Sequence, residues 1–276
     1  MKTLIVTADD FGLSSKINAG IIEAHSRGLV TASSLLIAAP STQEAIELSR
    51  KYPQLQIGLH LGIVESYSLS KNKSLLSTSS YLGENKPCLH ADWKSLCIDH
   101  ILKGRFNQED WKEEFELQII EFLKSFKSIP FINSTQHLHM MPLFMNILKP
   151  LCLKYEIPHI RSGKKLIYSG ESSKRSFQTL GIQLMSCFDN SEVNLAAVDE
   201  AGKSSIYTML NVFKKIPHGV TELMVHPGFQ DLSLKKLIPG TYKNFNWETE
   251  LDALCSKELK DALTTHSISL SQFPVL

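Results

Sequence analysis

The feature that most constrains the fold is an alternation of short apolar runs with helical patterns along the chain. The runs are rich in β-branched residues and leucine, as buried strands are. Between them, apolar residues recur every three to four positions, as they do on one face of a helix. Repeated strand–helix units of this kind favour an α/β fold with a mostly parallel sheet or barrel. The strand candidates are residues 4–7, 33–37, 57–61, 131–135, 159–161, 219–225 and 268–270.

The clearest helix candidate covers residues 109–126, where large apolar side chains form one stripe. Ser41 and Glu44 have the spacing of a capping box at the start of a helix. Thr249 and Asp252 have the same spacing near the start of a closing helix. The other helix candidates are residues 17–28, 42–51, 143–155 and 247–266.

From about residue 65 to residue 104 the periodicity fails, and seven serines occur between Ser66 and Ser80. A loop this long in a compact domain is usually functional or mobile. Its aromatic residues Tyr67, Tyr81 and Trp93 could stack on sugar rings or simply anchor the loop. No internal repeat or domain boundary is evident, so we expect residues 1–276 to form a single domain with this excursion.

Composition excludes several function classes. The chain has 29 basic and 28 acidic residues, so it lacks the positive charge that drives binding to a phosphate backbone, and we expect no nucleic acid partner. No apolar run approaches the roughly 20 residues that span a bilayer. The N-terminal apolar run is too short for a secretory signal, so we expect a cytoplasmic protein. Five scattered cysteines without a Cys-x-x-Cys pair favour reduced thiols.

Polar residues lie at the carboxyl ends of four of the expected strands. They are Asp9 and Asp10 after the first, His60 in the third, His137 and His139 after the fourth, and His226 after the late strand. In parallel α/β folds the carboxyl ends of the strands form the face on which chemistry occurs. Adjacent carboxylates at the end of a buried strand are costly unless a cation or hydrogen bonds compensate them. Together with imidazoles, they favour a metal site.

Each of these motifs also has a plainer interpretation. Asp9 and Asp10 could cap a helix that starts near Ser14. His60 and His226, taken singly, could be ordinary buried or surface histidines. The strongest local signal is the pair His137 and His139, because side chains two apart on an extended strand point the same way. The coincidence of four motifs on one expected edge favours the metal site.

Four segments together resemble the YdjC family of carbohydrate deacetylases, also called the ChbG/HpnK family. The resemblance covers nearly the whole chain. Residues 30–40 are more similar to the hopanoid-associated HpnK branch than to the chitooligosaccharide branch. The segments are residues 7–14, TADDFGLS, residues 58–61, GLHL, residues 136–140, QHLHM, and residues 225–228, VHPG.

The resemblance implies a distorted (β/α) barrel, related to the barrel of the polysaccharide deacetylases. It also implies a divalent metal, zinc or magnesium, and hydrolysis of the N-acetyl group of an N-acetylated sugar or glycoconjugate. The substrate would be a small sugar or a glycolipid, and hopanoid-linked N-acetylglucosamine is the suggestion of the HpnK branch. A homodimer is a further expectation.

By position, the resemblance makes Asp10 and His60 metal ligands. Asp9 would be the general base, and His226 the general acid that protonates the departing amine.

Three further residues are site candidates. Arg161 would orient Asp9 or bind substrate, with a surface ion pair as the alternative. His139 and Phe11 are candidates for contacts with the substrate.

One departure from the family pattern concerns the third metal ligand. The family motif resembles Asp-Ser-His-x-His-x-His, but this chain has Asn133 and Thr135 at the positions of the aspartate and the first histidine. A hydroxyl is a poor substitute for an imidazole at such a site. Water could fill the position, His137 could move in, or metal affinity could be low. On a strand, a two-residue shift moves a side chain by roughly 6–7 Å.

This departure motivates an alternative function. A family member without the metal would be catalytically impaired and would bind glycan. A metal phosphoesterase on the same scaffold is a third reading, although no residue demands it.

Overall fold

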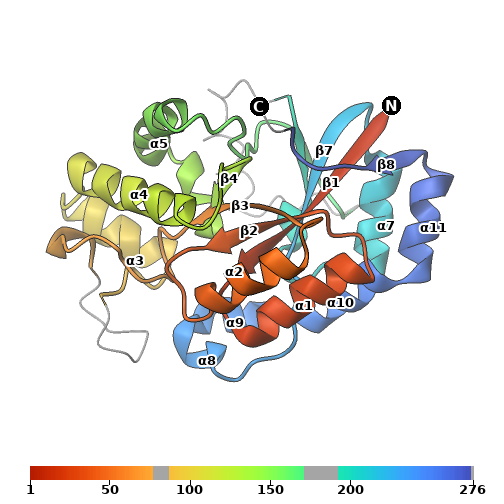
Figure 1. Ribbon diagram of the computed structural model, residues 1–276, viewed down its shortest axis with the longest axis horizontal. Helices are drawn as coiled ribbons and strands as arrows, with labels where there is room; N and C mark the ends of the chain where they lie inside the picture. Colours follow the sequence, from red (N-terminus) through yellow and green to blue (C-terminus); the bar gives the residue numbers. More distant parts are fainter. Residues whose placement is uncertain (77–86, 171–191, 275–276) are drawn as a thin grey trace.

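The computed structural model describes residues 1–76, 87–170 and 192–274. Within them, eight strands form one sheet in the order β4-β3-β2-β1-β7-β6-β5, with β8 also paired to β1, and every strand pairing is parallel. The sheet curls into a half-barrel, which confirms the expected fold class (Figure 1). The strands are β1 (Lys2–Phe11), β2 (Ala32–Leu36), β3 (Gln56–Leu61), β4 (Ile132–Ser134), β5 (Leu166–Ile167), β6 (Asn194–Ala196), β7 (Gly219–Val225) and β8 (Ile268–Leu270).

Most expected strands are present, but the one at residues 159–161 is not. There the chain forms only an isolated bridge between Ile160 and Ile132. The sequence did not predict β5 and β6, because strands of two and three residues are too short to show an alternation of side chains.

The helices lie around the curled sheet. Figure 1 shows α4 and α5 beside β3 and β4, α1, α2 and α10 together on one side, and α7 and α11 near β8. The α-helices are α1 (Ser15–Ser26), α2 (Thr42–Lys51), α3 (Trp93–Cys97), α4 (Gln108–Leu123), α5 (Pro142–Lys154), α7 (Ile206–Lys215), α8 (Leu234–Leu237), α9 (Pro239–Asn244), α10 (Trp247–Cys255) and α11 (Lys257–Thr265). Shorter turns are η1 (Lys73–Leu75), η2 (Ile98–Leu102), η3 (Thr135–Met140) and η5 (Val198–Glu200).

Two helix predictions need correction. The closing helix is two helices, because Ser256 ends α10 and its side chain caps α11 by accepting the N–H of Leu259. The cap of α10 is Asn246. Ser41 precedes α2 but makes no capping bond with its side chain, so the expected box with Glu44 does not form.

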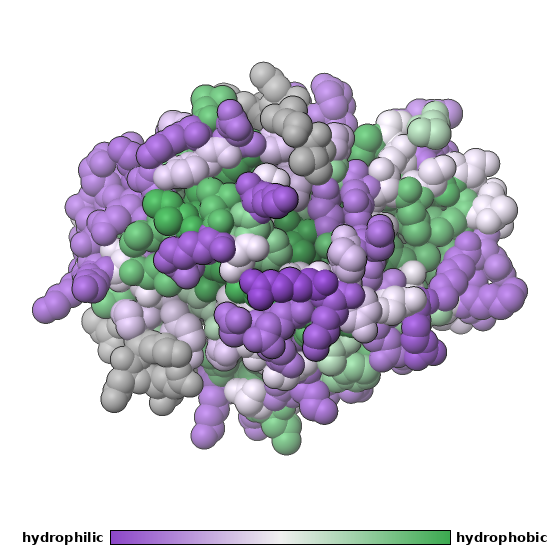
Figure 2. All heavy atoms as spheres, viewed as in Figure 1, coloured by the Kyte–Doolittle hydropathy of each residue, from purple (hydrophilic) through white to green (hydrophobic). Residues whose placement is uncertain are grey.

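The core lies between the sheet and its helices. In α4, Trp111, Phe115, Ile119 and Phe122 are fully buried, as their spacing predicted. Hydrophilic side chains cover much of the outer helices in Figure 2, and hydrophobic ones show between them. No helix in the described ranges combines the length and the apolar character that crossing a bilayer requires.

The excursion between β3 and α4 contains η1, α3 and η2 in its described parts. Its start is fixed by the fully buried Glu114 of α4, which accepts hydrogen bonds from Ser68 Oγ at 2.7 Å, from Ser70 N at 2.7 Å and from Leu69 N. Tyr67 is buried, which argues against stacking on a sugar, whereas Tyr81 lies outside the described residues.

The cysteines Cys88, Cys97, Cys152 and Cys255 are free thiols, in line with the expected reduced state. The fifth, Cys187, lies outside the described residues.

Candidate active site

The two aspartates lie where β1 ends in a bulge. The register between β1 and β2 shifts between Ala8 and Phe11, and Asp10 has a left-handed backbone with φ 69°. Ser14 caps α1 by accepting the N–H of Ile17 at 3.3 Å. Neither aspartate is therefore the cap of that helix.

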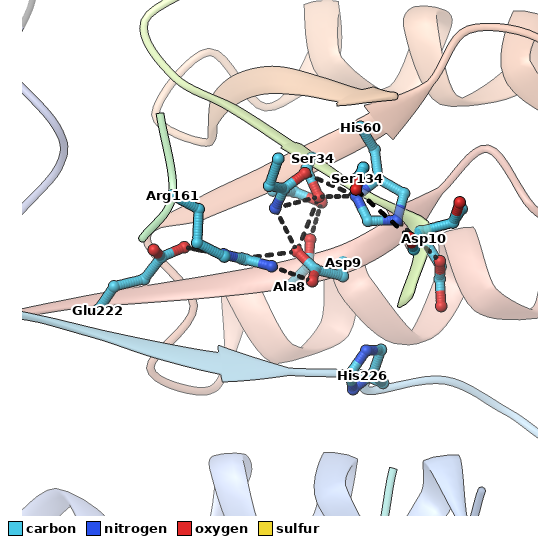
Figure 3. A network of polar contacts seen from close by, with 12 residues as sticks. Ala8, Asp9, Asp10, Ser34, His60, Ser134, Arg161, Glu222 and His226 are labelled. Atoms are coloured by element: carbon cyan, nitrogen blue, oxygen red, sulfur yellow. Dashed lines mark hydrogen bonds and ion pairs between the residues drawn. The ribbon is translucent and has the colours of Figure 1, made fainter. Parts of the chain in front are cut away.

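Asp9 is buried at the centre of a hydrogen-bond network (Figure 3). Its Oδ1 accepts hydrogen bonds from Ser34 Oγ at 2.8 Å, from Asn133 Nδ2 at 2.9 Å and from Arg161 Nη2 at 2.9 Å. Its Oδ2 accepts one, from Arg161 Nη1 at 2.5 Å. Oδ2 is thus the oxygen with an acceptor position left over.

Arg161 lies between two buried carboxylates, Asp9 and Glu222 of β7. Its Nε and Nη2 donate to Glu222 Oε1 at 3.0 and 2.7 Å. Arg161 is itself buried, so it is not part of a surface ion pair. It is not among the described residues that line the cavity next to Asp9. Its position fits the orienting of Asp9 better than contact with substrate.

The charge state of Asp9 follows from these contacts. Burial alone raises the pKa of a carboxyl group, but the guanidinium of Arg161 and the neighbouring His60 outweigh it. The pKa of Asp9 therefore lies well below its usual range, and the group is a carboxylate at any ordinary pH.

His60 faces Asp10 across 3.4 Å, from Nε2 to Oδ1. Asn133 turns its amide nitrogen to Asp9, so its oxygen faces His60 Nδ1 at 2.6 Å and accepts a hydrogen bond from the Nδ1–H group. That hydrogen bond leaves Nε2 as the nitrogen with a lone pair. A lone pair and a carboxylate oxygen so close together repel each other unless a proton or a cation lies between them.

The pKa of His60 is consistent with a proton between Nε2 and the Asp10 carboxylate. Burial lowers the pKa of the imidazole, but the carboxylates of Asp10 and Asp9 outweigh this effect and raise it above its ordinary value.

Thr135, at the position where the family motif has histidine, uses its hydroxyl elsewhere. Its Oγ1 accepts the backbone N–H groups of Ile63 and Val64, both at 3.1 Å. These bonds hold the chain that leaves β3, and both acceptor positions of the hydroxyl are thereby used.

His137 and His139 do not lie on a strand, which corrects the expectation that they point the same way. β4 ends at Ser134, and Gln136 and His137 have left-handed backbones with φ 50° and 57°. The 6–7 Å shift along a strand therefore does not apply to His137.

The turn separates the two imidazoles. His137 lines the cavity beside Asp9, and its buried Nδ1 has no hydrogen-bond partner in the described part of the chain. Burial, together with Arg161, lowers its pKa well below the ordinary value, so it is neutral. His139 is buried between Ser134 Oγ and the carbonyl of Arg161, at 2.7 and 3.0 Å.

His226 follows β7 and lies across from His60 in Figure 3. Its Nδ1 is 4.0 Å from Oε2 of the fully buried Glu250 in α10, and its backbone N–H donates to the same oxygen at 2.5 Å. Its ring contacts Phe245 edge-on, with the centroids 4.7 Å apart.

A cavity of about 540 Å³ brings five of the predicted site residues together: Asp9, Asp10, His60, His137 and His226. Phe11 and His139 do not reach it. Phe11 is fully buried in the core, and His139 is held by the contacts described above. These positions argue against substrate contact for either residue.

The residues fit a divalent metal in kind, although not as a complete set. Carboxylate and imidazole are ligands that such metals accept, and Asp10 and His60 supply one of each. Among the described residues, however, no three His, Cys, Asp or Glu side chains form a group that could hold a metal. His137 is the further nitrogen donor in the same cavity.

Sequence reasoning missed three acidic residues of the site region. Glu222 lies among the mostly apolar residues of β7, a signal that a buried charge needs a partner. Glu250 has polar as well as apolar neighbours in α10, where the sequence pattern does not distinguish it. Glu65 also lines the cavity, but it lies in the aperiodic excursion, where no pattern distinguishes it.

Comparison with known proteins finds the family described as YdjC-like protein, matched over residues 3–265. A carbohydrate deacetylase of Halalkalibacterium halodurans is 28% identical over 259 residues, which cover 90% of this chain and 95% of the relative. A chitooligosaccharide deacetylase of Serratia marcescens is 28% identical over 287 residues, covering 99% of this chain and 98% of the relative.

A solved structure is similar over the whole chain. It is the crystal structure of an Enterococcus faecalis V583 protein, provisionally named for cellobiose-phosphate cleavage. It has a TM-score of 0.70 and 26% identity, and covers 99% of this chain and 97% of its own. None of these similarities distinguishes the HpnK branch, which stays a prediction.

Proposed function

The chain belongs to the YdjC-like protein family, and on that premise we propose that it is a carbohydrate deacetylase that hydrolyses the N-acetyl amide of a sugar. The observation that carries the proposal is the common cavity of Asp9, Asp10, His60 and His226. Relatives of nearly the same length are named carbohydrate and chitooligosaccharide deacetylases, which supports this chemistry.

In this proposal Asp9 takes the proton of the attacking water. Oδ2 is the oxygen that accepts it, because Oδ1 already accepts three hydrogen bonds. Arg161 keeps the carboxylate ionised and fixed in direction. The same contacts make Asp9 a weak base, so the water must be acidified by its surroundings.

A divalent cation would supply that acidification when bound, and would also polarise the amide carbonyl. We propose that Asp10 and His60 hold it and that His137, from the same cavity, is the third donor, although the three side chains are not grouped as a metal site in this structure. Asn133 supports this role by directing the lone pair of His60 Nε2 toward Asp10.

His226 completes the reaction by giving a proton to the amide nitrogen as the carbon–nitrogen bond breaks, so that acetate and a free amine leave. The carboxyl group of Glu250 lies 4.0 Å from Nδ1 of this ring and accepts the backbone N–H of His226, which fixes the position of the residue.

The experiment is acetate release from N-acetylglucosamine, di-N-acetylchitobiose and an N-acetylglucosamine-bearing lipid. The wild type should release acetate from at least one of them. Asp9→Asn and His226→Ala should each lower the rate by about 10²-fold or more. The matched control is Asp261→Asn, an exposed carboxylate on α11. Unchanged acetate release in both site variants would refute the roles assigned here.

The finer expectations belong to the same proposal: a small N-acetylated sugar or glycolipid as substrate, a homodimer, and a cytoplasmic location. The alternative, a catalytically impaired glycan binder, has in its favour the residue type at Thr135 and the lack, within the described residues, of three side chains grouped to hold a metal. Saturable glycan binding that is indifferent to chelator, with no acetate released, would support it.

A further inference from the structure

Glu65 has a backbone conformation that a glycine would adopt more easily. Its φ is 56°, in the left-handed region, and its N–H is held by the carbonyl of His90 at 2.8 Å. Left-handed backbone is unfavourable for residues with a side chain. Such strain in a site residue points to a use for the side chain.

The side chain of Glu65 is fixed at the wall of the cavity. Its Oε1 accepts the hydroxyl of Thr241 in α9 at 2.8 Å, and the Gln136 side chain is a second hydrogen-bond partner. Gln136 in turn accepts the backbone N–H of Trp93 at 3.1 Å. Four cavity residues from four separate segments thus form one connected polar frame.

No cation is prominent among the groups that act on Glu65. Burial raises its pKa to about 7, in spite of the hydrogen bonds from Thr241 and Gln136, and the carboxylates of Asp10 and Asp92 act in the same direction as burial. Within the described ranges Glu65 forms no salt bridge, although Lys94 and Lys203 also line the cavity. A carboxyl group in this setting is suited to an uncharged ligand that carries hydrogen-bond donors.

We propose that Glu65 binds a hydroxyl group of the sugar and so fixes the position of the ring in the cavity. Trp93, which is 42% exposed, contributes a flat apolar side chain to the lining of the same cavity. The choice of a sugar rests on the proposed function, whereas the binding role of Glu65 does not depend on turnover.

The test compares the wild type with Glu65→Gln and Glu65→Gly. Glutamine retains the shape without the charge, and glycine removes the side chain while adopting the same backbone without strain. One probe is cellobiose, which has hydroxyl groups but no acetamide, so its Kd is measured by calorimetry without turnover. The other is di-N-acetylchitobiose, for which KM and kcat are measured from acetate release.

We expect the Kd for cellobiose and the KM for di-N-acetylchitobiose to rise about fivefold to tenfold in both variants, with little change in kcat. Thr241→Val should produce a smaller rise in the same direction, because it only loosens Glu65. The matched control is Glu109→Gln, an exposed carboxylate at the start of α4.

The outcomes separate this inference from the deacetylase proposal. Cellobiose binding that depends on Glu65, without acetate release, would retain the binding role and refute the deacetylase. Acetate release with unchanged Kd and KM in both Glu65 variants would support the deacetylase and refute the binding role of Glu65. A wild type that binds neither sugar would overturn the role of Glu65.

Discussion

The hydroxyl of Thr135 lies 3.1 Å from the backbone nitrogen of Val64 and accepts its N–H, as it also does for the preceding residue. Thr135→Val should therefore leave two buried N–H groups without a partner and lower the free energy of unfolding by about 1–3 kcal/mol. Thr135→Ser keeps the acceptor and should retain most of the stability. Urea unfolding followed by circular dichroism measures both, and equal stability of the two variants would show that these bonds contribute little.

Arg161→Lys should weaken both activity and stability, because one ammonium group cannot replace a fork that binds Asp9 and Glu222 together. We expect kcat/KM to fall at least about tenfold and the free energy of unfolding to fall by about 1–3 kcal/mol.

The pH dependence gives Arg161→Lys a more specific readout. The pKa of Asp9 is depressed in the wild type, so the carboxylate persists as pH falls. With weaker pairing the pKa of Asp9 rises, and activity should begin to fall at a higher pH than in the wild type. The control is Arg27→Lys, which alters an exposed pair with Glu23. Identical pH–rate profiles for wild type and Arg161→Lys would contradict the orienting role.

Glu114→Leu should release the start of the 65–104 excursion. The substitution keeps an apolar side chain but removes the hydrogen-bond acceptor for Ser68, Leu69 and Ser70. We therefore expect the free energy of unfolding to fall by about 2–4 kcal/mol. Limited proteolysis should then cut within residues 66–76 faster than in the wild type. Glu121→Leu, at an exposed position of the same helix, should leave the cutting rate unchanged. Resistance of the Glu114 variant equal to that of the wild type would overturn the anchoring role.

Local sequence signals predicted the regular elements well. The ends of α2 and β7 were predicted to the residue. The failures have physical causes. Residues 247–266 keep one apolar stripe through two helices, so periodicity alone does not reveal the break at Ser256.

The site was predicted only as far as motifs at strand ends allow. Asp9, Asp10, His60 and His226 meet in one cavity because parallel strands end at one edge. The pairing of Asp9 with Arg161 joins positions 152 residues apart, which no local pattern encodes. The left-handed turn that places His137 at the cavity contains no glycine, so the sequence carries no signal of a left-handed backbone there.

Stability should fall with acid as His100 becomes charged. Burial, and then the neighbouring His90, lower the pKa of His100 to about 4, against about 6.5 in the unfolded chain. The folded state therefore binds fewer protons in this range, so its stability is complete above pH 6.5 and decreases as pH falls toward 4. His100→Phe, which keeps an aromatic ring beside Trp111, should reduce this dependence. The measurement is the urea concentration at the midpoint of unfolding, from pH 7 to pH 4, for the wild type and His100→Phe. If this midpoint falls equally with pH in both proteins, His100 is not the cause.

Metal binding is the prediction that decides between the deacetylase and its alternative. Chelator-stripped protein is titrated by calorimetry with Zn²⁺, Co²⁺, Mn²⁺ and Mg²⁺. We expect one-to-one binding that is lost in Asp10→Ala, because this carboxylate is the charged partner of His60 Nε2. Loss in His137→Ala as well would assign that imidazole to the place that Thr135 cannot fill. The control is His25→Ala. His25 is a partly buried residue of α1 that is hydrogen-bonded to the carbonyl of Val30, and its variant should bind metal as the wild type does. A wild type that binds none of the four metals would refute the metal-dependent mechanism, since the low pKa of Asp9 makes it too weak a base to activate water alone.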